Sequence, residues 1–184
     1  MNPSLKEINE IYLQIQDFID PPLEYFDRIT KEQRLDFVNK RNEYLQKHEN
    51  TLRKLQEILS RLSPGDIIEG YQHGCRMLQI SLAGHMFRHF SEMYIPLMID
   101  AIKKDNRHTA PIFLRALSVN TKNKEQIGSL ALTSLNSQWQ SVIDAALSVV
   151  YELRVVAALP KIKEFAKGTD PAIAELAKNI LDAW

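Results

Sequence analysis

Apolar residues recur at intervals of three and four along nearly the whole chain, and this spacing constrains the fold more than any other feature. Such spacing places side chains on one face of an α-helix, whereas a half-buried strand needs strict alternation. Valine, threonine and aromatic residues nowhere form alternating runs bounded by turn residues, and helix-forming residues dominate. The 184 residues suffice for one domain or a small array of repeats. We therefore predict an all-α fold.

The N-terminal part, residues 1–91, is predicted to be a helical bundle. Two reciprocal capping patterns mark where its main helices begin: Ser4 with Glu7, and Thr30 with Gln33. They predict one helix over residues 4–19 and one long helix over residues 30–62, which would be roughly 48 Å long at ~1.5 Å per residue. Four apolar residues of the long helix recur at seven-residue spacing: Val38, Leu45, Leu52 and Leu59. This pattern leaves two interpretations open, a helix packed on its own chain or the seam of a coiled-coil dimer.

Residues 92–184 are predicted to form shorter helices in pairs. The expected pairs are 92–104 with 110–119, 123–135 with 138–154, and 157–167 with 171–182. Ile95-Pro96 and Leu159-Pro160 are 64 residues apart, which is about two units of 32. A fixed period of this length is typical of stacked helical repeats.

The last pair resembles a HEAT repeat. The residues that carry the resemblance are Leu159-Pro160-x-Ile162, Phe165, Gly168-Thr169-Asp170-Pro171-x-Ile173 and Ala177. The family has a proline early in its first helix and an Asp-Pro turn into its second. The resemblance implies an N-terminal helical bundle packed on a short HEAT-like α-solenoid of about three helix pairs, within one compact molecule. Each pair would bury one face against its neighbour.

The charge balance and the cysteine content narrow the classes of function. Lysine plus arginine and aspartate plus glutamate each total 23, so the chain lacks the basic surplus that a general nucleic-acid binder needs. Cys75 is the single cysteine, which fits a reducing compartment. Charged residues interrupt the most apolar stretch, 142–160, and the first 20 residues contain no apolar signal core. We expect a cytoplasmic protein that neither binds a membrane nor contacts nucleic acid directly.

The sequence offers one weak candidate for a metal site. His85, His89 and Glu92 would share one helix face at i, i+4 and i+7, and two histidines with a glutamate form a known zinc ligand set. Position 86 is methionine, so the zinc-protease pattern H-E-x-x-H is missing. We favour the alternative that these histidines are structural, and we expect no metal, no cofactor and no catalytic centre.

Acidic residues are concentrated near the N-terminus. Residues 1–27 contain one base and six acids, whereas residues 28–61 contain nine bases and five acids. One interpretation is that two antiparallel helices neutralise each other. The other is that part of the acidic face attracts a basic partner. Under the second interpretation Asp17, Asp20 and Glu24 are predicted partner-binding residues.

The predicted helix 138–154 has a polar stripe beside its apolar one. The stripe consists of Ser141, Asp144, Ser148 and Tyr151, with Trp139 near the start of the helix. The HEAT resemblance implies that second helices of the pairs line a concave binding face. We therefore predict partner contact through Asp144, Tyr151, Glu152 and Trp139, with ordinary solvated surface as the alternative.

A short, neutral helical-repeat chain of this kind resembles small bacterial immunity proteins, including those of contact-dependent growth inhibition systems. The resemblance implies a cytoplasmic inhibitor that binds a cognate protein toxin, often a basic nuclease domain, and covers its active site. A HEAT-like scaffold or adaptor is the first alternative. The second is a relative of the HEAT-like DNA glycosylases, which would need a basic surface to hold DNA.

Overall fold

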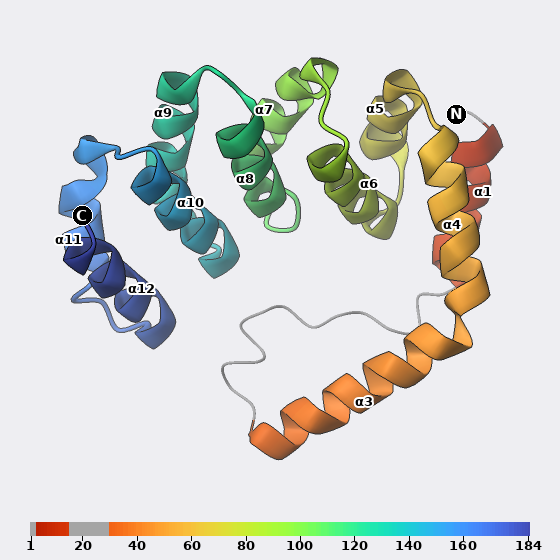
Figure 1. Ribbon diagram of the computed structural model, residues 1–184, viewed down its shortest axis with the longest axis horizontal. Helices are drawn as coiled ribbons and strands as arrows, with labels where there is room; N and C mark the ends of the chain where they lie inside the picture. The colour runs from red at the N-terminus through yellow and green to blue at the C-terminus, as the bar shows by residue number, and fades with distance from the viewer. Residues whose placement is uncertain (1–2, 15–29) are drawn as a thin grey trace. The chain divides into compact units, whose positions relative to one another are not determined.

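The computed structural model describes residues 3–14 and 30–184, and within them the secondary structure is helical with no strand (Figure 1). The predicted all-α fold is confirmed for this part of the chain. The structure separates into two compact units, Met1–Leu82 and Ala83–Trp184. The division falls inside helix α6 (Arg76–Arg88), which contributes residues to both units. Among the described residues, no helix has the length and apolar content needed to cross a bilayer.

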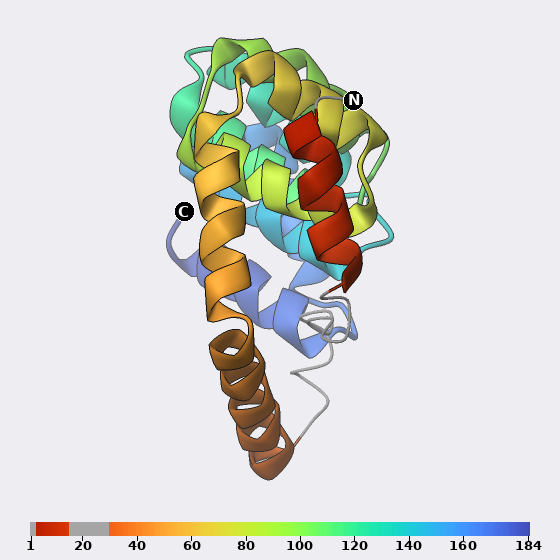
Figure 2. The same ribbon diagram turned by 90° about the vertical axis from the view of Figure 1, so that its right-hand side faces the viewer.

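The first unit is organised around two antiparallel helices. Helix α1 (Pro3–Gln14) packs against α4 (Glu49–Arg61), and Figure 2 shows the two running side by side. Helix α5 (Pro64–His73) follows, with Ser63 and Asp66 forming a reciprocal cap and Pro64 as the expected first helical residue. Apolar side chains from these helices are buried together: Leu5, Ile8, Leu55, Leu59 and Ile67.

Helix α1 already includes Pro3, so Ser4, the predicted N-cap, lies inside the helix and is not a cap. The prediction at Thr30 is confirmed. Its hydroxyl accepts the Gln33 amide proton at 3.2 Å, and the Gln33 side chain accepts the Thr30 amide proton at 2.9 Å. A reciprocal cap of this kind satisfies two of the backbone donors that the start of a helix leaves free.

The prediction of one long helix over residues 30–62 is wrong. Helix α3 (Lys31–Lys47) ends at His48, whose φ of −107° and ψ of 12° interrupt the helix before α4 begins at Glu49. The two helices also differ in burial: Leu35 and Val38 of α3 remain 62% and 42% exposed, whereas α4 buries Leu55 and Leu59. The break also divides the apolar residues at seven-residue spacing between α3 and α4. A coiled-coil seam needs a continuous helix, so the break does not favour that interpretation.

The second unit contains three successive helix pairs. They are α7 (Ile95–Lys103) with α8 (Ala110–Asn120), α9 (Lys124–Ser134) with α10 (Gln140–Glu152), and α11 (Leu159–Phe165) with α12 (Pro171–Asp182). Helix α10 also packs against α8 on one side and α12 on the other, as Figure 1 shows. The core between the pairs includes the fully buried side chains of Phe113, Leu114, Leu117, Val142 and Val149. The helix pairs predicted from the sequence are therefore present.

Two of these pairs begin in the same way. A 3₁₀ turn precedes α7 (η1, Glu92–Tyr94) and another precedes α11 (η2, Val156–Ala158), 64 residues later. Each turn is followed by a proline in the first turn of the helix, Pro96 and Pro160. Proline fits there because its missing amide proton would have no partner within the helix.

Helices α7 and α10 end with a non-glycine residue in the left-handed conformation, Asp105 with φ 51° and Arg154 with φ 52°. In each case the following amide donates back five residues, from Asn106 to Ala101 at 3.2 Å and from Val155 to Val150 at 2.9 Å. This is the hydrogen-bond pattern of a Schellman cap, which usually places glycine at this position. Asp105 and Arg154 therefore carry the backbone cost of a left-handed conformation.

Candidate protein-binding surface on helix α10

Asp144 lies near the middle of α10 and forms an ion pair with Arg115 of α8. The Arg115 Nη2 to Asp144 Oδ2 distance is 2.9 Å, and the two side chains are 53% and 43% exposed. An exposed pair of this kind adds little to stability because water competes for both charges. The ion pair does fix the positions of the Arg115 and Asp144 side chains on the surface.

Glu152 lies at the end of α10 and also reaches α8. The buried Ser118 hydroxyl, which has one proton, lies 2.9 Å from the Arg115 carbonyl oxygen and 3.4 Å from Glu152 Oε2, so it donates mainly to the carbonyl. The Lys124 ammonium donates to the Ser118 carbonyl. The Ser118 hydroxyl and carbonyl thus each have a hydrogen-bond partner, and the Glu152 side chain stays exposed.

Trp139 is the N-cap residue of α10 and lies under an arginine. The Arg107 guanidinium carbon is 5.0 Å from the indole centroid, within the range of a cation–π contact. The Ser141 hydroxyl donates to the Arg107 carbonyl at 3.3 Å, which ties the loop before α8 to the first turn of α10. The indole is half-exposed, with the Arg107 guanidinium over its ring.

Tyr151 belongs to a cluster of two aromatic rings around Arg154. The Arg154 guanidinium carbon is 4.9 Å from the Tyr151 ring centroid and 5.7 Å from that of Trp184. The two aromatic centroids are 6.3 Å apart. Arg154 Nη1 also donates to the carbonyls of Ala183 at 3.3 Å and Trp184 at 3.2 Å. The left-handed backbone of Arg154 is therefore accompanied by contacts that fasten the residues after α12 to the end of α10.

We use the name α10 surface for these four predicted residues and their partners. Its members are Trp139, Asp144, Tyr151 and Glu152, with Arg107, Arg115, Arg154 and Trp184. Asp144 and Tyr151 are seven residues apart and share one face of the helix, with Glu152 beside them. Each of the four predicted residues contacts another residue of the chain, Trp139 at the start of the helix, Asp144 in its first half, and Tyr151 and Glu152 at its end.

The structure describes only some of the acidic residues near the N-terminus. Asp17, Asp20 and Glu24 lie outside the described residues. In the described part, the Glu7 carboxylate of α1 forms an ion pair with Lys54 of α4 at 2.6 Å. This pair is an instance of antiparallel helices neutralising each other.

The prediction that His85, His89 and Glu92 lie on one helix is wrong for Glu92. Helix α6 ends at Arg88 and Glu92 lies in the separate turn η1, so Glu92 does not share a helix face with His85 and His89. No group of three or more potential metal ligands occurs among the residues that the structure describes. The two histidine rings are close, with centroids 4.6 Å apart. Burial lowers the pKa of His85 below its usual 6.5, and the nearby charges of His89 and Arg88 lower that pKa further.

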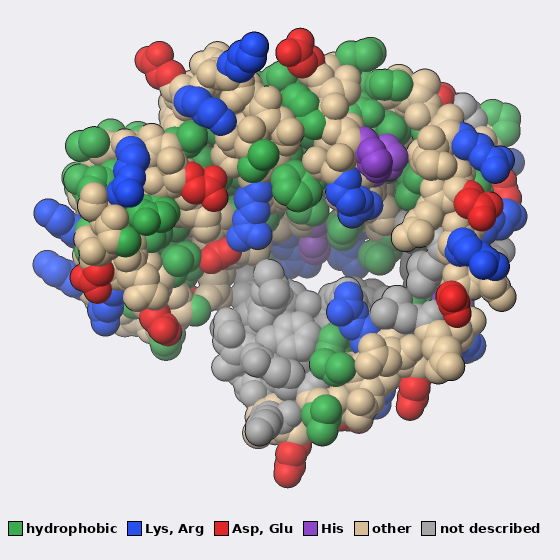
Figure 3. Space-filling model, in the orientation of Figure 1, with side chains coloured by type: hydrophobic (Ala, Val, Ile, Leu, Met, Phe, Trp, Pro, Cys, Tyr) green, Lys and Arg blue, Asp and Glu red, His purple; other side chains and the backbone are tan. Residues whose placement is uncertain are grey.

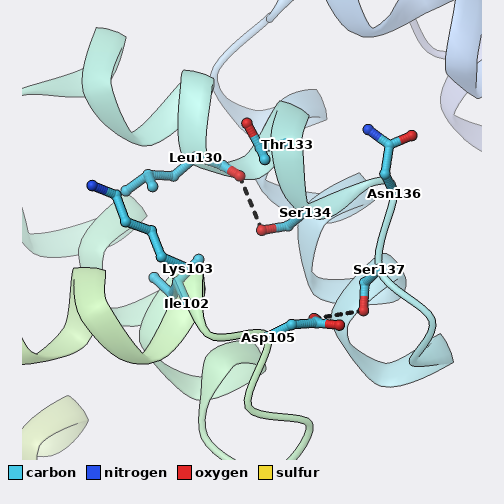
Figure 4. A pocket seen from close by; sticks show the side chains of 8 residues that line it. All are labelled: Ile102, Lys103, Asp105, Leu130, Thr133, Ser134, Asn136 and Ser137. Atoms are coloured by element: carbon cyan, nitrogen blue, oxygen red, sulfur yellow. Dashed lines mark hydrogen bonds between the residues drawn. The ribbon is translucent and has the colours of Figure 1, made fainter.

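A pocket of about 260 Å³ lies where α7 and α9 end (Figure 4). It is lined by Ile102, Lys103, Asp105, Leu130, Thr133, Ser134, Asn136 and Ser137. The Ser137 hydroxyl donates to the Asp105 carboxylate at 2.7 Å, and the Ser134 hydroxyl donates to the Leu130 carbonyl at 2.9 Å. Both serine hydroxyls thus serve the local structure, and no histidine is among the lining residues to act as a base toward them.

Sequence reasoning missed Arg107 and Trp184 as members of the α10 surface. The sequence separation between residues that bridge neighbouring helix pairs could have indicated these partners. Arg115 with Asp144, Ser118 with Glu152, Gln140 with Asp170 and Arg154 with Trp184 are 29 to 34 residues apart. A partner for each polar residue could have been sought about one repeat away.

No protein-family model, curated protein or solved structure matched the chain. On the face shown in Figure 3, acidic and basic side chains are interspersed over the second unit, with no continuous acidic area.

Proposed function

We propose that this chain is a protein-binding inhibitor that acts as an immunity protein against a cognate toxin, with helix α10 at the centre of its binding surface. On this proposal the pairs of the second unit form a short HEAT-like array, and the protein acts in the cytoplasm. The separations of 29 to 34 residues between bridging side chains support such an array, because stacked repeats repeat their contacts once per unit.

The single observation that carries the proposal is the ordering of aromatic and arginine side chains along α10. Tryptophan, tyrosine and arginine are the residues that most often dominate binding energy at protein interfaces. Here Trp139 is held under Arg107, and Tyr151 is held beside Arg154. A side chain that is already ordered loses less conformational entropy when a partner binds. The surface is therefore suited to a macromolecular partner.

The charges of the α10 surface favour a protein partner over DNA. A DNA-binding face needs arginines that are free to contact phosphates. Arg115 is paired with Asp144, and Arg154 donates to the carbonyls of Ala183 and Trp184. The surface combines three arginines with two carboxylates, Asp144 and Glu152, so a protein partner would meet charges of both signs there.

The test is to co-express the chain with the product of the gene directly upstream of its own. We expect that product to arrest growth when expressed alone, and the chain to restore growth and to elute with it as one complex. A product that is neither toxic nor bound would overturn the proposal. A product that binds but has no toxicity would favour the alternative of a scaffold or adaptor.

A further inference from the structure

His85 and His89 form a pair of imidazoles at the C-terminal end of α6. The His89 amide donates to the His85 carbonyl at 2.8 Å, so the helical turn continues through His89 although the helix proper ends at Arg88. Residues four apart on such a turn lie one above the other. Accordingly, the two ring centroids are 4.6 Å apart, with the ring planes tilted by 36°.

This distance matches what two imidazoles adopt around one metal ion. A metal bound to a histidine nitrogen at ~2.0–2.1 Å lies roughly 3.2 Å from the ring centroid. Two such rings then have centroids about 4.5 Å apart at a right angle around the metal, and about 5.2 Å apart at a tetrahedral angle. We propose that His85 and His89 chelate a divalent transition metal of the Cu²⁺ type, with water in the remaining positions.

The preference for copper follows from the geometry and from general affinity. The observed 4.6 Å is closer to the right-angle value, which corresponds to the square-planar or tetragonal coordination of Cu²⁺ and Ni²⁺. Imidazole nitrogen suits both ions, and Cu²⁺ binds a given nitrogen site most tightly among the first-row divalent metals. Mg²⁺, which prefers oxygen ligands, should not bind.

Accessibility also favours the site. His89 is exposed and His85 is half-buried, so a metal can approach from solvent. The histidine pair shares no residue with the α10 surface, and its test needs no partner protein. The metal proposal can therefore be tested independently of the proposed function.

The experiment is a calorimetric titration of the untagged, full-length protein with Cu²⁺ at neutral pH, together with electron paramagnetic resonance of the one-to-one complex. We expect one tight equivalent of Cu²⁺ and hyperfine structure from two nitrogen ligands. His85→Gln and His89→Gln should each weaken binding by roughly tenfold or more, because the second ligand no longer acts at high effective concentration.

Two other histidines of the chain provide matched controls. His73→Gln and His108→Gln should leave the tight equivalent and the two-nitrogen spectrum unchanged, and Mg²⁺ should produce no heat of binding. Because His89 is exposed, His89→Gln is expected to fold normally, which circular dichroism can verify. Absence of tight binding, a single-nitrogen spectrum, or equal weakening by His73→Gln would overturn the proposal.

Discussion

Gly70 occupies a position in α5 where a side chain would press on two buried leucines. A Cβ atom there would lie 2.6 Å from Leu5 Cδ2 and 2.9 Å from Leu82 Cδ1, and both leucines are fully buried. Because neither leucine can move into solvent, we expect Gly70→Ala to lower the free energy of unfolding by about 1–3 kcal/mol. Urea denaturation measures the change. Gly65→Ala in the same helix is the control, since the nearest atom to its Cβ is Ser63 Oγ at 3.8 Å, and equal effects would contradict the close packing.

Arg154 has a left-handed backbone and several side-chain contacts. Two substitutions distinguish the effect of the backbone on stability from the effect of the contacts. Arg154→Gly removes the contacts with Tyr151 and Trp184 but suits the φ of 52°, whereas Arg154→Ala removes the contacts and keeps the strain. We expect the alanine variant to be less stable than the glycine variant by roughly 1–2 kcal/mol. Thermal unfolding of the two proteins side by side tests this. An alanine variant as stable as the glycine variant would show that the strain is negligible.

At the scale of the helix, Asp170 shows how one side chain fixes where an element begins. Its Oδ1 accepts the amide protons of Ala172 and Ile173, both at 3.1 Å, at the start of α12. We expect Asp170→Ala to cost about 0.5–2 kcal/mol of stability, because two backbone donors lose their acceptor. Asp170→Asn retains an acceptor oxygen and should cost less. Chemical denaturation distinguishes the two, and equal losses would argue against the cap.

The starts of several helices could be predicted because their determinants are local. Thr30 with Gln33, Pro64 and the Asp170-Pro171 turn act within a few residues of sequence, and the structure confirms all three. The break at His48 could not be predicted in this way. No glycine or proline marks it, and its neighbours are good helix formers. The break follows from packing, since α4 buries Leu55 and Leu59 with residues of α1 that are far away in sequence.

At the scale of the whole molecule, the predicted residues of the α10 surface depend on local spacing, whereas their partners depend on long-range packing. The spacing along one helix was enough to place Asp144 and Tyr151 on one face. Their neighbours Arg115 and Trp184 come from other helices or from the end of the chain, so their positions depend on how the helix pairs pack. Asp144 is consequently ion-paired within the chain, which charge counting could not show.

Asp144 offers a test that separates binding from stability. Because the Arg115–Asp144 pair is largely exposed, we expect Asp144→Ala and Arg115→Ala to change the free energy of unfolding by about 0–1 kcal/mol. If α10 is the binding surface, Asp144→Ala should weaken the complex with a basic toxin partner, and the loss should shrink as salt is raised. Calorimetric titration at two salt concentrations measures both effects.

Glu125→Ala serves as the matched control for Asp144→Ala, because it removes an exposed carboxylate from α9 outside the α10 surface. Its affinity for the partner should equal that of the unmodified protein at both salt concentrations. Double substitution of Trp139 and Tyr151 by alanine should weaken binding further by at least about 2 kcal/mol, as expected when two ordered aromatic side chains contact a partner. If the complex tolerates both the Asp144 and the aromatic substitutions, the binding surface lies elsewhere and the assignment to α10 fails.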